Sequence, residues 1–533
     1  MMAQGGPHRI AIIADAHFHD PTGDFGGIGV EVAGERLALR SWRDVESAPR
    51  AVNESAAALR AALERIVASG IRHVILAGDY TDDGQAETVR RLAMLLHHFQ
   101  ADHGLRFHAI PGNHDAYGPH GKHVSTRLMT APGRTVLVTS DPDLDPAAVV
   151  SAAMRCEGMP AALLPMAAFG LFRQPWHLHW ETPFGSSDAP GDRMHDATAA
   201  DGSVTHRLMD ASYLVEPEPG LWLLLIDANV FEPRPGRRDP TRKQAFLDPA
   251  DAGWTALLRV KPFLLPWIAS VTARARASDK TLVTVSHYPV LDPFEDTAGS
   301  EAALFGQTAF VRRTPTPAVG QALIGAGLNW HAGGHLHVTA TTRMVTGSGT
   351  LTNAALPSLV SFAPGYTVIE ARGDTIRAMT VPLDDLPADP RLTALYADEG
   401  REAPGLPFGD FLAAQYRSRI RNIRIPTLWP KELASRLAPM SVRDLVALLG
   451  ETTEDAAAGA SYPVIEMIAD ACMLREAGLN ALRHIDPERV RCLRDLAGWG
   501  DAAADPHTSH PAFLRRFLSV LAVSFRRIDQ AEQ

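Results

Sequence analysis

Short apolar runs rich in β-branched residues alternate with helical segments over the first 110 residues, and this rhythm constrains the fold more than any other feature. Strands are predicted at 9–14, 71–77 and 105–110. Helical apolar spacing lies between them at 53–68, where Asn53 is a candidate N-cap, and at 86–102. The sequence therefore predicts an α/β layered fold, in which ligands bind at the carboxyl ends of the strands.

The middle of the chain reads as an insertion followed by further strands. From Tyr117 to about Leu214, Pro, Gly, Ser and Met are mixed, and we expect an insertion that is helical at 146–154. The fully apolar runs at 221–226 and 281–285 predict buried strands. A helix at 254–277 should be kinked or split by its two prolines. Short strands of a second, more antiparallel sheet are predicted at 338–345, 358–362, 367–370 and 376–381.

The chain changes character near residue 390, after which apolar spacing is helical. Helices are predicted at 410–421, 441–449, 464–477, 487–497 and 513–528. A single core rarely grows beyond about 250–300 residues, so a chain of 533 residues should hold two domains or one large domain plus an extension. We expect a first domain at 1–390, with the insertion at 117–214, and a helical C-terminal domain at 391–533.

Polar side chains gather in five blocks, each where an apolar run ends. Taken alone, each block has a simpler explanation, such as a polar turn or a buried histidine. Together they supply carboxylates, imidazoles and an amide oxygen, which is the inventory for holding two metal ions and orienting a phosphate. The blocks are Asp15-Ala-His17, Gly78-Asp79-Tyr-Thr-Asp82-Asp83-Gly, Gly112-Asn113-His114-Asp115, His287 and Gly334-His335-Leu-His337.

With these blocks in this order, the sequence resembles the calcineurin-like metallophosphoesterase superfamily, whose pattern is DxH, GDxxDxG, GNH[DE], a lone His and GHxH. The resemblance covers roughly residues 8–385 and leaves the helical C-terminal extension outside. It implies a four-layer α-β-β-α sandwich with a dinuclear metal site. It also implies a ligand set: Asp15, His17 and His337 for one ion, Asn113, His287 and His335 for the other, and Asp79 bridging both.

The resemblance further implies the chemistry of the site. Carboxylate, imidazole and amide ligands suit two divalent or trivalent ions of Mn, Fe, Zn or Co. Such ions, about 3.5–4 Å apart, clamp the attacking and leaving oxygens and hold a hydroxide nucleophile. By the same resemblance His114 is the acid for the leaving oxygen, and Asp82 orients its imidazole. We expect Asp115 to be a structural turn residue.

Departures within the motifs favour one branch of the superfamily. Asp83 stands where protein Ser/Thr phosphatases carry Arg, and Asp115 where they carry Glu. Asp82 stands where purple acid phosphatases carry a Tyr ligand. The remaining likeness is to bacterial phosphodiesterases that act on cyclic nucleotides or glycerophosphodiesters. A phosphomonoesterase, a protein phosphatase-like enzyme and a non-catalytic metal-binding scaffold acting through its helical tail stay open as alternatives.

The composition and net charge limit which binding partners the chain is expected to have. The net charge of −10 and pI of about 6.1 give no general footprint for nucleic acid, so a small-molecule phosphoester is the expected partner. No apolar run approaches the ~20 residues of a membrane span. Three distant cysteines indicate free thiols, and we expect a cytoplasmic protein. The apolar stripes of the C-terminal helices fit a homodimer, but also capping or packing on the sandwich, so the oligomeric state stays open.

Overall fold

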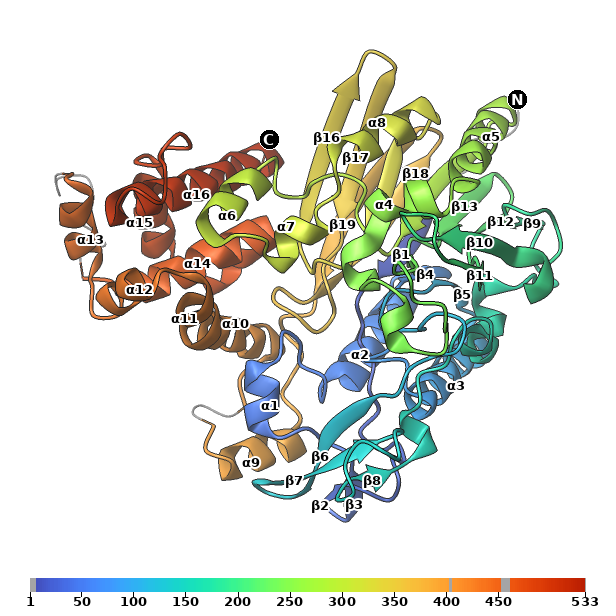
Figure 1. Cartoon of the computed structure of the whole chain (residues 1–533), viewed down its shortest axis with the longest axis horizontal. Helices are drawn as coiled ribbons and strands as arrows, with labels where there is room; N and C mark the ends of the chain where they lie inside the picture. The colour runs from blue at the N-terminus through green and yellow to red at the C-terminus, as the bar shows by residue number, and fades with distance from the viewer. Residues whose placement is uncertain (1–5, 402–404, 452–460, 533) are drawn as a thin grey trace.

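Two β-sheets stack at the centre of the molecule (Figure 1). The computed structural model describes residues 6–401, 405–451 and 461–532. The sheets meet through β5 with β13 and through β14 with β18, while α3 packs on β5, α5 on β14 and α8 on β17. The predicted α-β-β-α sandwich with a helical C-terminal extension is confirmed.

The first sheet has the strand order β19-β18-β1-β4-β5. Strands β1, β4 and β5 are parallel and alternate with α2 and α3, which confirms the βαβαβ rhythm predicted from the sequence. The elements are β1 (His8–Ile13), α2 (Ser55–Ala68), β4 (His73–Ala77), α3 (Ala86–His103), β5 (Arg106–Ile110), β18 (Gly365–Arg372) and β19 (Thr375–Pro382).

Asn53 is not the N-cap of α2, which was a wrong prediction. Glu54 precedes the helix instead, and it makes no capping hydrogen bond through its side chain. The Asn53 amide is engaged elsewhere: its oxygen accepts from the Arg40 backbone N–H, and its nitrogen donates to the Arg40 carbonyl and the Tyr396 hydroxyl. Asn53 therefore joins separate chain segments rather than starting a helix.

The second sheet has the order β16-β17-β15-β14-β13-β12-β9. The predicted helix at 254–277 is split at Pro262 into α4 and α5, as expected, whereas Pro266 lies inside α5. The elements are β9 (His179–Glu181), β12 (Tyr213–Glu218), β13 (Leu221–Ile226), α4 (Pro249–Val260), α5 (Leu264–Ala277), β14 (Thr281–Ser286), α6 (Ala298–Phe305), α7 (Ala309–Arg313), α8 (Pro317–Gly325), β15 (Trp330–Gly333), β16 (Ala340–Thr346) and β17 (Gly349–Ala355).

The strands predicted after residue 338 do not form a sheet of their own. The hairpin β16–β17 extends the second sheet, and the hairpin β18–β19 extends the first. The run 358–362 is a buried loop rather than a strand, because its apolar residues fill the core without a ladder partner. Apolar content alone does not separate a buried loop from a buried strand.

The insertion carries small sheets at the periphery. The helix predicted at 146–154 is wrong, since this stretch holds the short strand β8 and a single 3₁₀ turn. The peripheral elements are β2 (Val30–Val32), β3 (Glu35–Leu37), α1 (Trp42–Ser47), β6 (Ser125–Ala131), β7 (Arg134–Thr139), β8 (Val149–Val150), β10 (Met194–Thr198) and β11 (Thr205–Met209).

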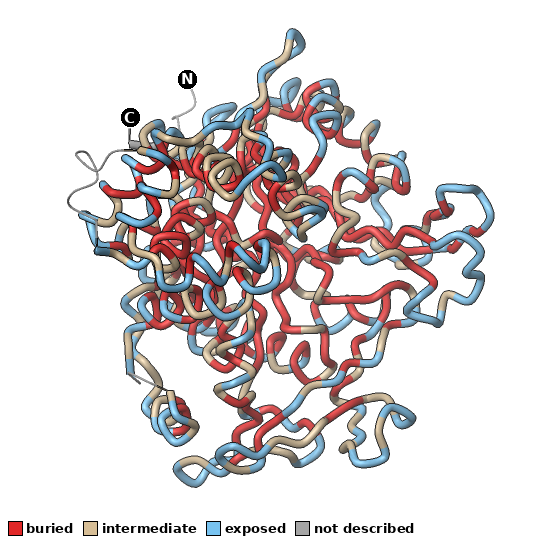
Figure 2. Tube along the Cα trace, turned by 60° about the vertical axis from the view of Figure 1, so that its left-hand side comes forward, coloured by how far each residue is buried: buried red, intermediate tan, exposed pale blue. Residues whose placement is uncertain are grey.

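The C-terminal extension is helical, as predicted, and its core is continuous with that of the sandwich (Figure 2). It contacts the rest of the molecule where α10 meets α1 and where α16 meets α6. The helices are α9 (Pro390–Asp398), α10 (Phe408–Arg419), α11 (Ile425–Leu428), α12 (Lys431–Leu437), α13 (Val442–Leu449), α14 (Val464–Ala477), α15 (Pro487–Ala497) and α16 (His510–Glu532).

Within the described ranges, no single helix is both long and apolar enough to cross a membrane. Helices α4 and α5 meet the length and composition requirement only when taken together, and they are bent by 80° at their junction.

Candidate metal centre

The five polar blocks converge where the two sheets present the carboxyl ends of their strands. Three blocks follow β1, β4 and β5 of the first sheet, and two follow β14 and β15 of the second. Neighbouring parallel strands end at the same edge, so side chains far apart in the sequence meet there. The site is therefore built by the sheets and lies between them.

Five of the seven predicted ligands have a left-handed backbone conformation, which side chains other than glycine rarely adopt. The φ angles are 50° at Asp15, 40° at His17, 47° at Asp79, 71° at His335 and 55° at His337. Each such residue costs of order 1–3 kcal/mol, and such strain gathers at functional sites. The chain turns sharply just past the strand ends, and the turn directs these side chains towards one another.

The motif glycines are needed for close approach. A Cβ atom on Gly78 would collide with the His287 ring, one on Gly112 with the Asp79 carboxylate, and one on Gly334 with the Asp15 carboxylate. Each glycine thus lets one block lie directly against a side chain of another.

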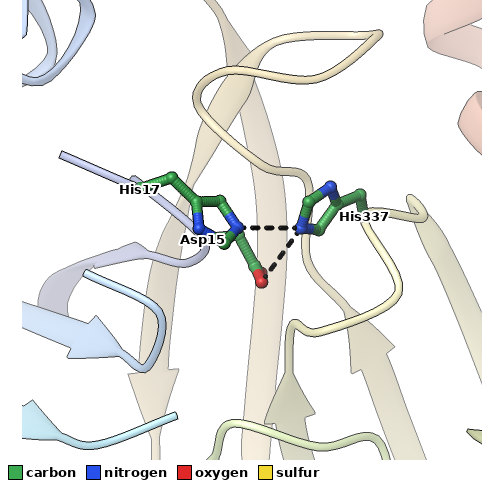
Figure 3. Close-up of side chains that lie close together, drawn as sticks. All are labelled: Asp15, His17 and His337. Atoms are coloured by element: carbon green, nitrogen blue, oxygen red, sulfur yellow. Dashed lines mark hydrogen bonds and ion pairs between the residues drawn. The ribbon is translucent and has the colours of Figure 1, made fainter. Parts of the chain in front are cut away.

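Asp15, His17 and His337 form the first group of possible ligands (Figure 3). His337 Nε2 lies 3.3 Å from Asp15 Oδ1 and 3.2 Å from His17 Nε2. The other His337 nitrogen, Nδ1, is 2.8 Å from Ser361 Oγ, which turns Nε2 towards the group. Two ring nitrogens and a carboxylate oxygen thus face a common point.

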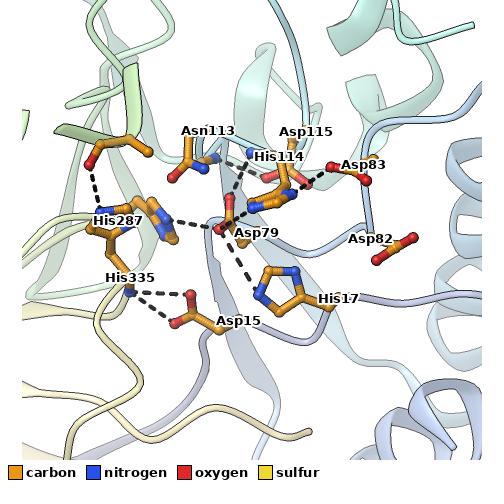
Figure 4. A network of polar contacts seen from close by, with 12 residues as sticks. Asp15, His17, Asp79, Asp82, Asp83, Asn113, His114, Asp115, His287 and His335 are labelled. Carbon is orange, nitrogen blue, oxygen red and sulfur yellow. Dashed lines mark hydrogen bonds and ion pairs between the residues drawn. The ribbon is translucent and has the colours of Figure 1, made fainter. Parts of the chain in front are cut away.

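Asp79, His287 and His335 form the second group (Figure 4). His287 Nδ1 donates to the Ala77 carbonyl at 3.0 Å, and its Nε2 lies 3.2 Å from Asp79 Oδ2. His335 Nε2 donates to the Ala250 carbonyl at 2.8 Å, so Nδ1 is left as its possible ligand atom.

Asp79 lies between the two groups. Its Oδ1 accepts from the His114 backbone N–H at 2.8 Å, while Oδ2 is 4.0 Å from Nε2 of both His17 and His114. Asn113 joins the site through Tyr288, whose hydroxyl lies 3.3 Å from Asn113 Oδ1 and whose ring packs against those of His287 and His335.

The residues present fit a pair of metal ions. His287 Nε2 is a buried atom that faces the Asp79 carboxylate, at 3.2 Å. Burial lowers the pKa of His17 and of His335 well below the usual value, so both imidazoles are neutral, as ligands must be. Burial would raise the pKa of Asp79, but the His287 and His114 imidazoles outweigh it and hold that pKa well below its usual range.

His287 shows the opposite balance in the same network. Burial would lower the pKa of His287, but the charge of Asp79 and its hydrogen bond outweigh burial and raise that pKa to about 9. A cation beside Asp79 has to displace the His287 proton before Nε2 can serve as a ligand.

The model of the calcineurin-like phosphoesterase family matches residues 8–136, which hold the first three blocks. The remaining blocks lie outside that match, and the structure brings them to the same edge. Over these residues this chain is a member of the calcineurin-like phosphoesterase family. It is a metal-dependent phosphoric ester hydrolase, as its sequence predicts.

Solved structures similar to this phosphoesterase are distant in sequence. A dimetal phosphatase from Danio rerio is 14% identical, covers 71% of this chain and 99% of its own, and has a TM-score of 0.36. The phosphopantetheinyl hydrolase of Mycobacterium tuberculosis is 12% identical, with 67% and 91% covered and a TM-score of 0.25. GAP50, the anchor in the inner membrane complex of Plasmodium, is 9% identical, with 71% and 85% covered and a TM-score of 0.28. No curated protein matches this chain.

The carboxylate that orients His114 in this phosphoesterase is Asp83 and not Asp82, which corrects the sequence-based expectation (Figure 4). His114 Nδ1 lies 2.7 Å from Asp83 Oδ1. Burial would raise the pKa of Asp83, but the hydrogen bond and charge of His114 outweigh it and lower that pKa. Asp82 faces away and forms ion pairs with Arg40 and Arg50, because adjacent residues in an extended turn point to opposite sides.

Asp115 is structural, as expected. Its carboxylate accepts from the Gly112 backbone N–H at 2.8 Å and from the N–H and hydroxyl of Thr81 at 2.9 and 2.7 Å. It therefore fastens the third block to the second, which places Asn113 and His114 beside Asp79.

Sequence reasoning missed Arg50. Its Nη1 lies 3.2 Å from His114 Nε2, at the open side of the site. Arg50 belongs to the connection between α1 and α2, far from every motif, and no spacing in the sequence links it to His114.

Proposed function

We propose that this phosphoesterase hydrolyses a phosphodiester, such as a cyclic nucleotide or a glycerophosphodiester, at a two-ion centre. The observation that carries the two-ion proposal is the position of Asp79, whose carboxylate belongs to ligand groups on both sides. The choice of a diester rests on Asp83. This residue stands where protein Ser/Thr phosphatases carry an arginine, and its carboxylate contacts His114 Nδ1.

The proposed ligands follow the two groups. Asp15, His17 and His337 hold one ion, Asn113, His287 and His335 hold the other, and Asp79 joins them. The donor set is mixed nitrogen and oxygen, which favours Mn, Fe, Zn or Co over Ca or Mg. When bound, such an ion pair supplies a nucleophile near neutral pH and stabilises the charge of an in-line displacement.

His114 is the proposed acid for the leaving oxygen. Asp83 holds Nδ1, so the ring can present only Nε2 to a substrate. Nε2 lies 4.0 Å from Asp79 Oδ2 and therefore next to the proposed ions. Asp83 orients this ring and balances its charge when it is protonated.

A substrate panel on metal-reconstituted full-length protein tests the proposal. We expect turnover of bis-p-nitrophenyl phosphate and of at least one natural phosphodiester, and loss of that turnover in Asp79→Ala and His114→Ala. His114→Ala should keep its metal, because His114 is not a proposed ligand, whereas Asp79→Ala should lose metal. Wild-type protein with both ions bound and no phosphoester turnover would sink the proposal and leave the scaffold alternative.

A phosphomonoesterase is the second candidate, and the position of Arg50 favours it. A guanidinium beside His114 adds positive charge where a phosphate would lie, and a monoester carries one negative charge more than a diester. A higher kcat/KM for p-nitrophenyl phosphate than for the bis ester would select this candidate.

We also propose the division into domains 1–390 and 391–533, a small-molecule partner and a cytoplasmic location. The last sheet strand ends at Pro382 and the first extension helix begins at Pro390, which supports the boundary. The free cysteines Cys156, Cys472 and Cys492 support a reducing compartment.

A further inference from the structure

The described side chains of the proposed metal centre differ in their exposure to solvent. The side chains of His17, Asp79 and His287 are 0–3% exposed. Those of His114, Asp83 and His337 are 18–30% exposed, and that of Arg50 is 15% exposed. A phosphoester must therefore enter past His114 and Arg50.

The Arg50 guanidinium reaches this open side with spare hydrogen-bonding capacity. Nη1 lies 3.2 Å from His114 Nε2, and Nη2 lies 3.5 Å from Asp82 Oδ1. Asp82 also pairs with Arg40, so one buried carboxylate stands between two guanidinium groups. The Arg50 guanidinium has five N–H donors, so donors remain for an anionic oxygen beside His114.

The backbone around Arg50 is tied to the site itself. The Ala51 N–H donates to the Val360 carbonyl at 2.8 Å, and Ser361 Oγ donates to the Pro49 carbonyl at 2.9 Å. The same Ser361 hydroxyl contacts His337 Nδ1. Arg50 and the proposed ligand His337 are thus held by one loop.

The helical extension braces the same segment from the other side. From α10, Gln415 Nε2 donates to the Val45 carbonyl at 2.5 Å and Ser418 Oγ to Glu46 Oε1 at 2.9 Å. Arg419 Nε donates to the Ser47 carbonyl at 3.3 Å. This gives α10 a role in the site, because it fixes the end of α1, from which the chain runs to Arg50.

We infer that Arg50 binds the non-reacting phosphoryl oxygens of the substrate, with Asp82 and α10 as the groups that position it. This inference rests on the proposed function and deepens it. A guanidinium donates two parallel hydrogen bonds to a phosphoryl group. When Arg50 turns to the substrate it releases His114 Nε2, which is then free to face the leaving oxygen. Protein Ser/Thr phosphatases carry an arginine at the position of Asp83. Arg50 takes the role of that arginine from another part of the chain.

Binding of inorganic phosphate to metal-loaded full-length protein tests this role without turnover. We expect Arg50→Ala to weaken phosphate binding roughly 10- to 100-fold and to raise KM similarly, with metal content unchanged. Arg50→Lys should recover part of the affinity, since lysine keeps the positive charge but cannot donate two parallel hydrogen bonds from one planar group. Arg40→Ala is the matched control, because it removes the other guanidinium on Asp82 and should leave phosphate affinity close to that of the wild type.

Two outcomes would overturn the role of Arg50: wild-type phosphate affinity in both Arg50 variants, or equal losses in Arg50→Ala and Arg40→Ala. If Arg50→Ala does not fold, Arg50→Lys alone decides, since a lysine without any loss of phosphate affinity contradicts bidentate binding. A protein that binds phosphate through Arg50 but hydrolyses no phosphoester contradicts the proposed function and leaves the assignment of Arg50 intact.

Discussion

The sandwich and the helical extension differ in backbone strain. In the sandwich, five of the non-glycine residues with positive φ lie together at the proposed metal centre: Asp15, His17, Asp79, His335 and His337. In the described part of the extension, positive φ angles occur only at glycines, such as Gly450, which ends α13. The buried Asp470 of the extension is paired with Arg417 and Arg489. The described part of the extension thus carries no strain of this kind, while the sandwich concentrates it where the proposed ligands meet.

Asp79→Asn should give the largest functional effect. It tests most directly whether the strained edge of the sandwich serves function rather than folding. Asparagine keeps the size and tolerates the left-handed backbone, but it removes the charge between the two ligand groups. We expect kcat/KM to fall by more than the roughly 10- to 100-fold that follows loss of a partner to a metal ligand. The metal-free Tm should fall only modestly, because the substitution removes the contact between the Asp79 carboxylate and His287. A large fall in Tm would show that Asp79 serves the fold.

Leu437→Ala should lower the stability of the protein and leave its function unchanged. Leu437 ends α12 with its side chain fully buried, so truncation leaves a cavity that costs about 2–5 kcal/mol of unfolding free energy. Urea denaturation measures this loss, and metal content and kcat of the folded protein should be unchanged. A change in kcat at full metal occupancy would mean that the two regions are coupled more closely than the bracing of α1 implies.

Asp83→Asn and Asp82→Asn separate the roles of two adjacent carboxylates of the second motif. Losing the Asp83 carboxylate leaves His114 without its orienting anion, and we expect kcat to fall about 10-fold or more with little change in KM. Losing the Asp82 carboxylate frees Arg50 and should act on KM instead. Steady-state kinetics of the pair distinguishes the two roles. The reverse pattern would restore the original assignment of Asp82 as the orienting residue.

Sequence reasoning reached the seven proposed ligands because each follows a buried strand, where a polar side chain is costly without a function. It chose Asp82 rather than Asp83 as the residue that orients His114. The two residues are adjacent in a turn, so a shift by one position decides which side chain faces His114. It could not reach Arg50, which lies 64 residues before His114 in a connection whose path depends on α10. It also mistook 358–362 for a strand, since this loop is as apolar as a strand but folds back to hold Arg50 and His337.

The smallest expected effect lies at Glu54, where the sandwich meets the extension. Burial raises the pKa of Glu54 to about 7, although Tyr396 of α9 donates a hydrogen bond to its Oε1 at 2.9 Å. Both residues line a cavity of about 900 Å³ between α2, α3 and α9, away from the metal centre. The carboxyl therefore binds its proton more tightly in the folded protein than in the unfolded chain.

This raised pKa gives a definite sign to the pH dependence of stability. The penalty for ionising Glu54 is absent below its ordinary value of 4.5 and complete above about 7, so unfolding free energy should decrease as pH rises through this window. We expect a contribution of about 1 kcal/mol, because the side chain is partly exposed and water screens its charge. Urea denaturation of Glu54→Gln and wild type at several pH values measures the difference. Glutamine should flatten the curve between pH 4.5 and 7, and two parallel curves would show that the junction carries no ionisation penalty.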